Sequence, residues 1–450
     1  MTAVETADAV RTGELTPRQT VQAALDRITA NDKTIRAFVT VRAEKALAEA
    51  DALAARADLA SLPLAGVPVA IKDNVPVAGE PMTIGSKATS RAPQPTDHAV
   101  VRRLRDAGAV VVGITAVPEM CMWGATDNPD VITRNPWNPE RTSGGSSGGA
   151  AAAVASGQVD IAHGNDGLGS IRIPSADCGL FGIKPGPGVV PAEFGGNGWY
   201  GMSENGPIAT TVADAALMLS VLADDPSYAD VSGDQSLTIA VAANHPLAGG
   251  RTDVHFATAL QRAVDLLPKL GHSAVHRDLP YPKNPLPLFL RWLGGSAADA
   301  QDIADHGGDV SKLQSRTKFH VAIGKQVNKR GLVNDGQRDK IADSVAAYLD
   351  SAGADLLMTP ALGRPPVEAR QWSTKSWAAN VWANVNYAPF QGVFNVIGWP
   401  AMSVPFGVHP VTNTPLAVHV AGRPGSEKTL LRLAAQIERE HPWQRVAPGF

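Results

Sequence analysis

Short apolar segments alternate with amphipathic helical segments along the first half of the chain, and this alternation restricts the possible folds most strongly. An apolar segment that ends at Ile71 predicts a strand. Residues 97–106 show the helical spacing of apolar residues and stop at Gly108, and residues 110–112 follow at once as another apolar run. Strand, helix and strand in succession are typical of a parallel sheet. The predicted fold class is therefore α/β, with a mixed, mostly parallel twisted sheet covered by helices on both faces.

The 450 residues are predicted to form a single domain with four successive parts. Residues 1–60 are expected to be helical, because residues 16–19 combine an N-cap threonine, a proline and the glutamine of a capping box. Residues 61–280 would form the α/β core. Residues 281–350 begin with a proline-rich linker and continue as polar helices, which indicates a variable helical insertion. Residues 351–450 return to the sheet and end in a helix.

Charge and cysteine content argue against several classes of function. Forty basic residues against 43 acidic residues give a net charge of −3, so neither nucleic acid nor a membrane surface is an expected partner. Cys121 and Cys178 are too few for a disulfide framework or a four-cysteine zinc site. The N-terminal residues lack a basic segment followed by an apolar run, and half of the uncharged residues 142–159 are glycine or serine. We therefore expect a cytoplasmic protein without a membrane span.

Two stretches rich in glycine and serine, residues 144–149 and 164–174, are candidates for functional loops. Ala150 follows the first stretch where a P-loop needs a lysine, and the second stretch has the wrong glycine order for a dinucleotide fingerprint. A G-x-S-x-G nucleophile elbow occurs at residues 144–148, but polar, proline-containing residues 135–141 replace the strand that should precede it. Flexible loops remain an alternative, although so many glycines are costly unless the backbone must approach another group closely.

A fourth interpretation combines both stretches with Lys72. This lysine follows an apolar strand, where desolvation would lower its pKa and let it act as a neutral base. Ser170 needs such a partner, because a hydroxyl is a poor nucleophile at its own pKa. The Gly-Leu-Gly run before Ser170 offers consecutive backbone N–H groups of the kind that an oxyanion hole requires.

The same segments resemble the amidase signature family, and the resemblance runs from about residue 5 to the C-terminus. It is weakest between residues 225 and 350. Several separated blocks in the same order make it far more specific than a single motif. The matching blocks are GVPVAIKDN around Lys72, GGSSGG at 144–149, GSIRIPSADCGLFGIKP from Gly169, GPIATTVADAALML at 206–219 and FNVIGWPAMSVPFG at 394–407.

The resemblance implies a Ser–cis-Ser–Lys triad in place of Ser–His–Asp. In this triad Ser170 would be the nucleophile, Ser146 the bridging serine after a cis peptide bond, and Lys72 the terminal base. The oxyanion hole would be formed by the backbone N–H groups of Gly167, Leu168 and Gly169. No metal and no organic cofactor would be required.

Other motif positions are expected to support the site rather than to react. Asp166, Ser147 and Arg172 would form hydrogen bonds to the glycine loops and hold Ser170 in place. The chain also departs from the family pattern at four positions. None of them belongs to the triad, so the departures affect the expected shape of the substrate and not the expected chemistry. The departures are Leu168 for a glycine, Gly167 for a threonine, Ile114 for a lysine and His419 for a glutamine.

The resemblance implies hydrolysis of a carbon–nitrogen bond in an amide through an acyl-enzyme on Ser170. Carbamate (urethane) or ester hydrolysis by the same triad is an alternative. Another is the amidotransferase A subunit, which acts on glutamine within a complex. A third is a relative that binds without catalysis. The expected partner is a small-molecule amide or carbamate, and the expected state is a monomer or homodimer. No H-E-x-x-H or similar spacing suggests a metal site.

Residues 372–399 hold seven of the 24 aromatic residues of the chain, which suggests either a packed core or a wall of the substrate pocket. Cys121 and the two residues after it would add a soft, adaptable surface to this pocket. With Leu168 beside the nucleophile, this predicts a preference for aryl or bulky apolar amides over glutamine. The candidate substrate-binding residues are Met122, Trp123, Trp377, Trp382, Tyr387 and Trp399.

Overall fold

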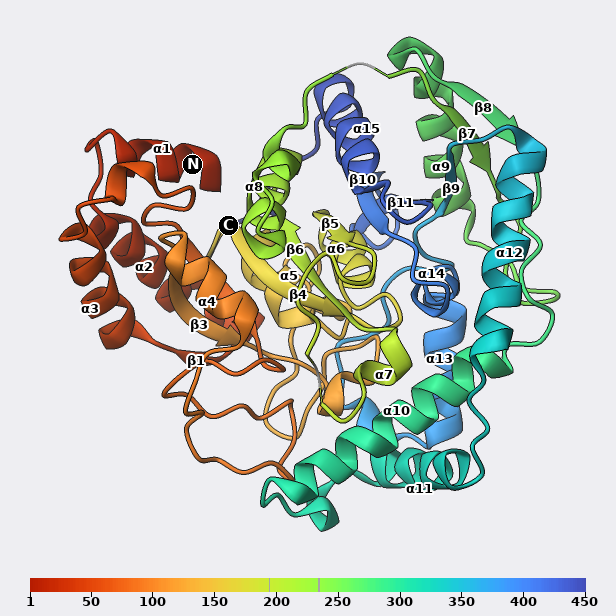
Figure 1. Ribbon diagram of the computed structural model, residues 1–450, viewed down its shortest axis with the longest axis horizontal. Helices are drawn as coiled ribbons and strands as arrows, with labels where there is room; N and C mark the ends of the chain where they lie inside the picture. The colour runs from red at the N-terminus through yellow and green to blue at the C-terminus, as the bar shows by residue number, and fades with distance from the viewer. Residues whose placement is uncertain (194, 234) are drawn as a thin grey trace.

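In the described part of the chain, eleven strands form one sheet, which runs through the molecule (Figure 1). The structure is a computed structural model, and it describes residues 1–193, 195–233 and 235–450. The strand order is β1-β3-β2-β4-β6-β5-β10-β11-β9-β7-β8. The strands are β1 (Phe38–Val41), β2 (Pro68–Lys72), β3 (Val110–Thr115), β4 (Ile161–Asp166), β5 (Phe181–Lys184), β6 (Glu204–Ala209), β7 (Thr238–Val241), β8 (Ser273–His276), β9 (Leu356–Pro360), β10 (Ala401–Val408) and β11 (Pro415–Gly422).

The mixed sheet confirms the predicted α/β fold class, but the expectation of a mostly parallel sheet is wrong. Of the ten strand pairings in the described part of the chain, six are antiparallel. The alternation that suggested parallel strands is local, and it does produce the parallel pair of β2 and β3. By contrast, β10 and β11 are joined by a short turn, and such a connection produces antiparallel neighbours.

Helices cover both faces of this sheet, as predicted. The longer helices are α1 (Ala3–Arg11), α2 (Pro17–Ile35), α3 (Ala43–Ala54), α4 (Ala99–Asp106), α5 (Gly148–Ala155), α8 (Val212–Ala223), α9 (Val254–Leu266), α10 (Leu286–Asp305), α11 (Ser315–Lys329), α12 (Asp335–Ala352), α13 (Trp377–Tyr387) and α15 (Glu427–Glu440). Shorter ones are α6 (Arg172–Cys178), α7 (Gly198–Gly201) and α14 (Gly392–Val396). Among the described residues, no helix has both the length and the apolar run needed to cross a membrane.

Successive residues of β2 show why both faces need cover. Val69 and Ile71 pack in a core cluster with residues of α4, α8 and α15. Ala70 points the other way, into a cluster with α2, α3 and α5. Because side chains alternate across a strand, this central strand is buried on both faces.

The N-terminal part is helical except for β1, a strand that the sequence did not predict. It is an edge strand of four residues, and only its first residue is buried, so it lacks a strong apolar pattern. The capping box predicted at Thr16 is present, since Gln19 donates from its backbone to the threonine hydroxyl and its side chain accepts in return.

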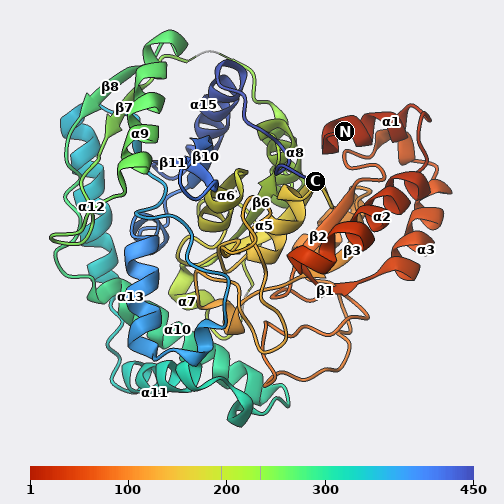
Figure 2. The ribbon, with the colours of Figure 1, turned by 180° about the vertical axis from the view of Figure 1, so that it is seen from behind.

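Residues 281–350 form α10, α11 and α12, which agrees with their predicted helical character. In Figures 1 and 2, α10 and α11 lie across one end of the molecule and α12 follows its edge. Tyr348 and Leu349 of α12 are buried with Leu357 of β9, so this segment also covers part of the sheet.

Candidate active site

Three loops converge where β2 and β4 end. These strands are parallel neighbours, so their carboxyl ends lie at one edge of the sheet. Lys72 is the last residue of β2, and Asp166 is the last residue of β4. Ser146 lies just before α5, and Ser170 lies in the loop between β4 and α6. The carboxyl edge of such a sheet is a common place for a ligand site.

Lys72 is fully buried and is held by two hydrogen bonds. Its Nζ donates to Ser146 Oγ over 2.8 Å and to the carbonyl oxygen of Asn165 over 2.9 Å. Burial lowers the pKa of Lys72 to about 8, although the nearby charge of Asp166 opposes this shift. A substantial neutral fraction is therefore available at mildly alkaline pH.

The two serines belong to loops that are tied to each other. The peptide bond between Gly145 and Ser146 is cis, as the family resemblance implied. The backbone N–H of Ser147 donates to the carbonyl oxygen of Ser170 over 3.2 Å. Ser146 is only 1% exposed, whereas Ser170 is half-buried, and both line one cavity. Lys72, Ser146 and Ser170 are thus gathered into one site.

A buried ion pair holds the loop that carries Ser170. Asp166 accepts hydrogen bonds from Arg172 Nε at 2.9 Å and from the backbone N–H groups of Gly169 and Ile171 at 2.5 and 3.1 Å. Burial alone would raise the pKa of Asp166, but the charge and the hydrogen bond of Arg172 hold it well below its usual range. These hydrogen bonds are the contacts that Asp166 and Arg172 need in order to hold the loop of Ser170 in place.

This network changes the expected oxyanion donors. The N–H of Gly169 is already engaged by Asp166. In the described part of the chain, the N–H groups of Gly167, Leu168 and Ser170 have no hydrogen-bond partner. Of the predicted oxyanion donors, Gly167 and Leu168 therefore keep a free N–H group, and Ser170 beside them does too.

The departures from the family pattern have local explanations. A side chain at Gly167 would meet the ring of Trp199 at 2.9 Å, so this position requires glycine beside that tryptophan. Leu168 directs its side chain to a cavity beside Ser170. His419 is buried, and its Nε2 accepts from Arg172 over 2.9 Å; the ring is neutral because burial and the arginine lower its pKa. Ile114 is a buried residue of β3.

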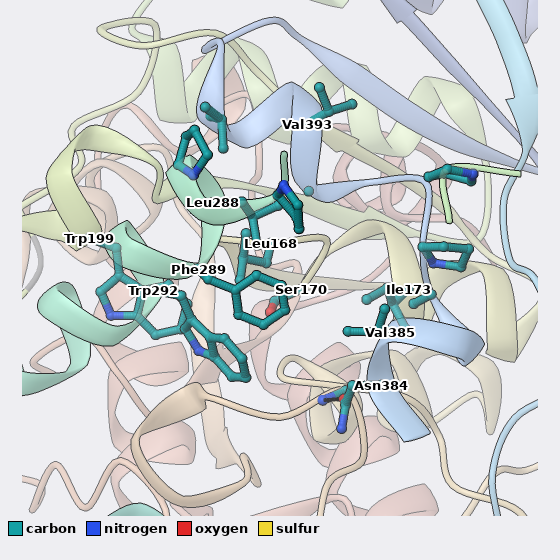
Figure 3. A pocket seen from close by; sticks show the side chains of 18 of the residues that line it. Leu168, Ser170, Ile173, Trp199, Leu288, Phe289, Trp292, Asn384, Val385 and Val393 are labelled. Atoms are coloured by element: carbon teal, nitrogen blue, oxygen red, sulfur yellow. Dashed lines mark hydrogen bonds between the residues drawn. The ribbon is translucent and has the colours of Figure 1, made fainter. Parts of the chain in front are cut away.

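The cavity beside Ser170 is about 180 Å³ in volume and mainly apolar (Figure 3). In Figure 3 the Ser170 hydroxyl lies among side chains from α10, from the end of α13 and from the loop after β4. Met122 and Trp123, two of the candidate substrate-binding residues, line this cavity. Other apolar residues around it include Leu168, Ile173, Trp199, Leu288, Phe289, Trp292, Val385, Val393 and Val396.

The expected aromatic wall from residues 372–399 is not found, because each candidate side chain has another environment. Trp377 donates from its indole nitrogen to His320 Nδ1 over 3.0 Å, and Trp382 is 70% exposed. Tyr387 is buried and donates its hydroxyl to Asp177. Trp399 packs in the core cluster around α10 and α12. The segment instead contributes aliphatic residues such as Val385 and Val393 to the cavity.

The aromatic lining comes largely from a segment that sequence reasoning missed. Tyr281, Phe289 and Trp292 lie in or beside the proline-rich stretch whose sequence predicts a linker. The Trp292 ring packs edge-on against Trp123, with ring centroids 5.5 Å apart. The signal was the apolar sequence LPLFLRW, whose leucine, phenylalanine and tryptophan residues suit a buried helix face.

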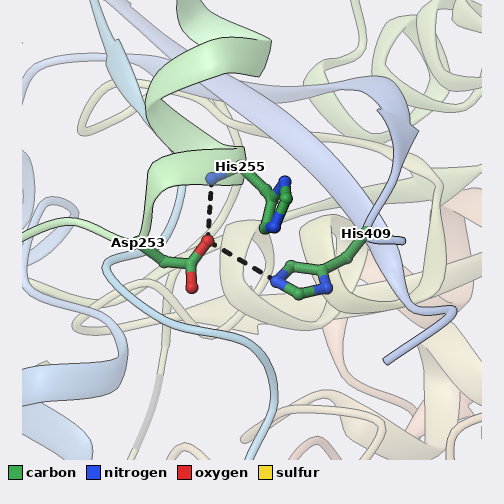
Figure 4. A group of neighbouring side chains, drawn as sticks. All are labelled: Asp253, His255 and His409. Atoms are coloured by element: carbon green, nitrogen blue, oxygen red, sulfur yellow. Dashed lines mark hydrogen bonds and ion pairs between the residues drawn. The ribbon is translucent and has the colours of Figure 1, made fainter. Parts of the chain in front are cut away.

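One cluster elsewhere has the residue types of a metal site (Figure 4). The ligand atoms of Asp253, His255 and His409 lie within 4.8 Å of one another. However, His409 Nδ1 accepts the backbone N–H groups of Val411 and Thr412, both at 3.2 Å. The neutral ring then carries its proton on Nε2, which faces Asp253 Oδ1 at 3.5 Å. In this tautomer Nε2 carries the proton and offers no lone pair to a metal ion.

Comparisons with known sequences match this chain to amidases over nearly its whole length. The amidase family profile matches residues 19–431. AmiB2 of Mycobacterium tuberculosis, a protein named as an amidase, is 37% identical over 460 aligned residues, covering 97% of this chain and 95% of AmiB2. The A subunit of the glutamyl-tRNA(Gln) amidotransferase of Carboxydothermus hydrogenoformans is 32% identical over 493 residues, covering 100% and 99%.

Solved structures share the fold. A bacterial aryl acylamidase of the amidase signature family matches with a TM-score of 0.86 and 25% identity, covering 98% of this chain and 96% of that one. A 6-aminohexanoate cyclic dimer hydrolase complexed with substrate matches with a TM-score of 0.87 and 28% identity, covering 100% and 98%. Fold and site together define a hydrolase of amide carbon–nitrogen bonds. The chain belongs to the amidase signature family.

Proposed function

We propose that Ser170, Ser146 and Lys72 act as nucleophile, proton bridge and base in amide hydrolysis. The observation that carries this proposal is the 2.8 Å hydrogen bond from the buried Lys72 Nζ to Ser146 Oγ, beside a cavity that Ser170 also lines. A neutral lysine can accept a proton from Ser146, which in turn accepts one from Ser170.

In the proposed reaction, Ser170 Oγ attacks the amide carbonyl carbon. The oxyanion is stabilised by the free N–H groups of the 167–170 loop. The carbon–nitrogen bond then breaks, and the proton from Ser170 reaches the leaving nitrogen through Ser146. Water hydrolyses the acyl-Ser170 ester and regenerates the serine. Only side chains, backbone and water take part in these steps.

The favoured substrate is an amide with an aryl or bulky apolar group. The support is the apolar cavity beside Ser170, in which Trp123, Phe289 and Trp292 offer aromatic surface. An aryl acylamidase among the structural neighbours has a name that fits this class. We place the reaction in the cytoplasm, on a small-molecule substrate, by a monomer or homodimer.

A hydrolysis screen with Ser170→Ala tests the proposal. Purified protein is incubated with anilides, alkyl amides, carbamates, esters and glutamine, and products are identified by mass spectrometry. We expect an anilide to be hydrolysed and the variant to lose nearly all turnover, as for other nucleophile deletions. Ser61→Ala removes an exposed hydroxyl and is the matched control. An active Ser170→Ala protein would refute the assignment.

Two alternatives use the same site. Carbamate or ester hydrolysis would appear in the screen as faster turnover of those compounds. The amidotransferase function has support in the full-length match to an amidotransferase A subunit, and it predicts that glutamine is hydrolysed faster than an anilide.

A further inference from the structure

Ser170 lies at the junction of two cavities of different chemistry. One is the apolar cavity described above. The other is about 1050 Å³ in volume and is also lined by Ser146 and Gly167. Four carboxylic acids and one arginine are among the described residues around it: Glu193, Glu204, Asp299, Asp302 and Arg338. Its charged lining is therefore mainly acidic.

The carboxyl group of Glu204 has a buried oxygen atom that accepts no hydrogen bond from the described residues. This residue begins β6 and is only 3% exposed. Its Oε2 is buried and has no hydrogen-bond partner in the described part of the chain. Burial raises the pKa of Glu204, although the nearby Lys184 charge opposes the shift. An unpaired buried carboxyl oxygen is costly, and a ligand that donates to it would remove that cost.

Asp299 lines the larger cavity and is hydrogen-bonded to Trp199. Its Oδ2 accepts from Trp199 Nε1 over 2.6 Å, and its Oδ1 accepts from the backbone N–H of Gly196 over 3.2 Å. Trp199 lines both cavities, and its left-handed backbone, with φ of 53°, shows that its position is imposed by the surrounding fold. A carboxylate has about four acceptor sites, so Asp299 retains capacity for a ligand.

The proton route indicates which part of the substrate enters each cavity. Ser146 lines the larger cavity and is absent from the lining of the apolar one. In the proposed function, on which this inference rests, Ser146 delivers the proton to the leaving nitrogen. The leaving amine must therefore lie on the Ser146 side, and the acyl group occupies the apolar cavity.

We propose that the larger cavity is a leaving-group site for amines that carry a second, positively charged group, held by Asp299 and Glu204. The substrate class is then an apolar acyl amide of a diamine. The Ser170 Oγ–carbon bond forms first and gives the oxyanion; the carbon–nitrogen bond then breaks, the serine proton moves to the leaving nitrogen, and the free diamine departs. An anionic amine would instead face the surplus of carboxylates.

Three amides with one acyl group test this inference. The 4-phenylbutanoyl group is coupled to 1,4-diaminobutane at one nitrogen, to n-pentylamine, and to 4-aminobutanoate, which gives cationic, neutral and anionic leaving groups of similar length. We expect kcat/KM for the cationic amide to exceed that for the neutral one about tenfold or more, and the anionic amide to be slowest. Equal or reversed rates would overturn the inference.

The outcome separates this inference from the proposed function. If 4-phenylbutanoyl anilide is hydrolysed but the cationic amide has no advantage, only the leaving-group site is refuted. If neither the anilide nor any of the three amides is hydrolysed, the proposed function itself fails.

Asp299→Asn adds a test at the residue level. Asparagine can still accept from Trp199 but lacks the charge, so the cationic-to-neutral ratio of kcat/KM should fall toward one. Asp305→Asn is the matched control, because Asp305 is also on α10 but is exposed and outside the lining of both cavities. A folded Asp299→Asn protein with an unchanged ratio would contradict the role of this carboxylate. If that variant does not fold, Glu204→Gln serves, with the same expected loss and the same contradicting result.

Discussion

Lys72 determines the pH range in which the site can work, because the proposed mechanism needs its neutral form. Its folded-state pKa of about 8 lies below the ordinary value of a lysine, and burial is the main cause. Below this pKa the amine is charged and cannot accept the serine proton. Its place at the end of an apolar strand allowed the lowered pKa to be predicted from the sequence.

We expect kcat/KM to rise about tenfold per pH unit below about pH 8 and to level off above it. Lys72→Ala should lower kcat/KM by several orders of magnitude, because the two serines and the lysine form one proton relay. Initial rates with an anilide across this range provide the measurement. A flat profile, with the chemical step rate-limiting, would argue against lysine as the base.

Cys121 is predicted to be chemically inert in the folded protein, although it lines both cavities. Burial raises the pKa of its thiol to about 11, so little thiolate forms at neutral pH. The pKa of the buried Cys178 is raised as well. A thiol reagent should therefore label neither cysteine quickly in the native protein and both after unfolding. Rapid labelling of one native thiol, mapped to Cys121, would contradict this.

The Asp166–Arg172 pair is a residue-level feature whose detail the sequence could not supply. Asp166→Asn would leave Arg172 buried without its charge partner, at a cost of about 3–5 kcal/mol in unfolding free energy. Asp51→Asn, which breaks an exposed ion pair with Arg18, should change stability little. Denaturant unfolding of both variants provides the comparison. Equal stabilities would show that the buried pair does not hold the loop.

At the scale of elements, the start of α10 matters more to the pocket than the aromatic segment of α13. Motifs and cap residues were readable locally, as the capping box at Thr16 illustrates. The partners of a helix face are not local. Nothing in the sequence near Phe289 indicates that Phe289 and Ser170 line the same cavity. Likewise, nothing near Tyr387 indicates that its hydroxyl donates a hydrogen bond to Asp177.

Phe289→Ala tests this assignment directly. Phe289 is half-buried and lines the apolar cavity, so its truncation should lower kcat/KM for a bulky aryl amide about tenfold through lost apolar contact. A small acetyl amide should be affected less. Trp382→Ala removes an aromatic side chain that is 70% exposed and should leave both substrates unchanged. If Trp382→Ala lowered kcat/KM and Phe289→Ala did not, the result would support the predicted aromatic pocket wall of residues 372–399 instead.

At the scale of the whole molecule, the sheet explains why distant motifs form one site. Lys72 and Asp166 end parallel neighbouring strands, which brings their loops to one edge of the sheet. The sequence predicted a strand before Lys72, but it indicated a loop and not a strand at residues 164–166. The proportion of antiparallel pairing could not be anticipated, because it depends on which distant strands become neighbours, such as β5 beside β10. The cavity walls likewise combine residues separated by more than a hundred positions.

The two cavities that meet at Ser170 also impose an order on the proposed catalytic cycle. In the proposed assignment, the acyl half would stay in the apolar cavity while the amine half would leave through the larger, charged one. The space vacated by the first product is then the route by which the second nucleophile arrives. Water and free amines would compete there for the same ester carbon, so at high amine concentration the acyl group would be passed on to a new acceptor.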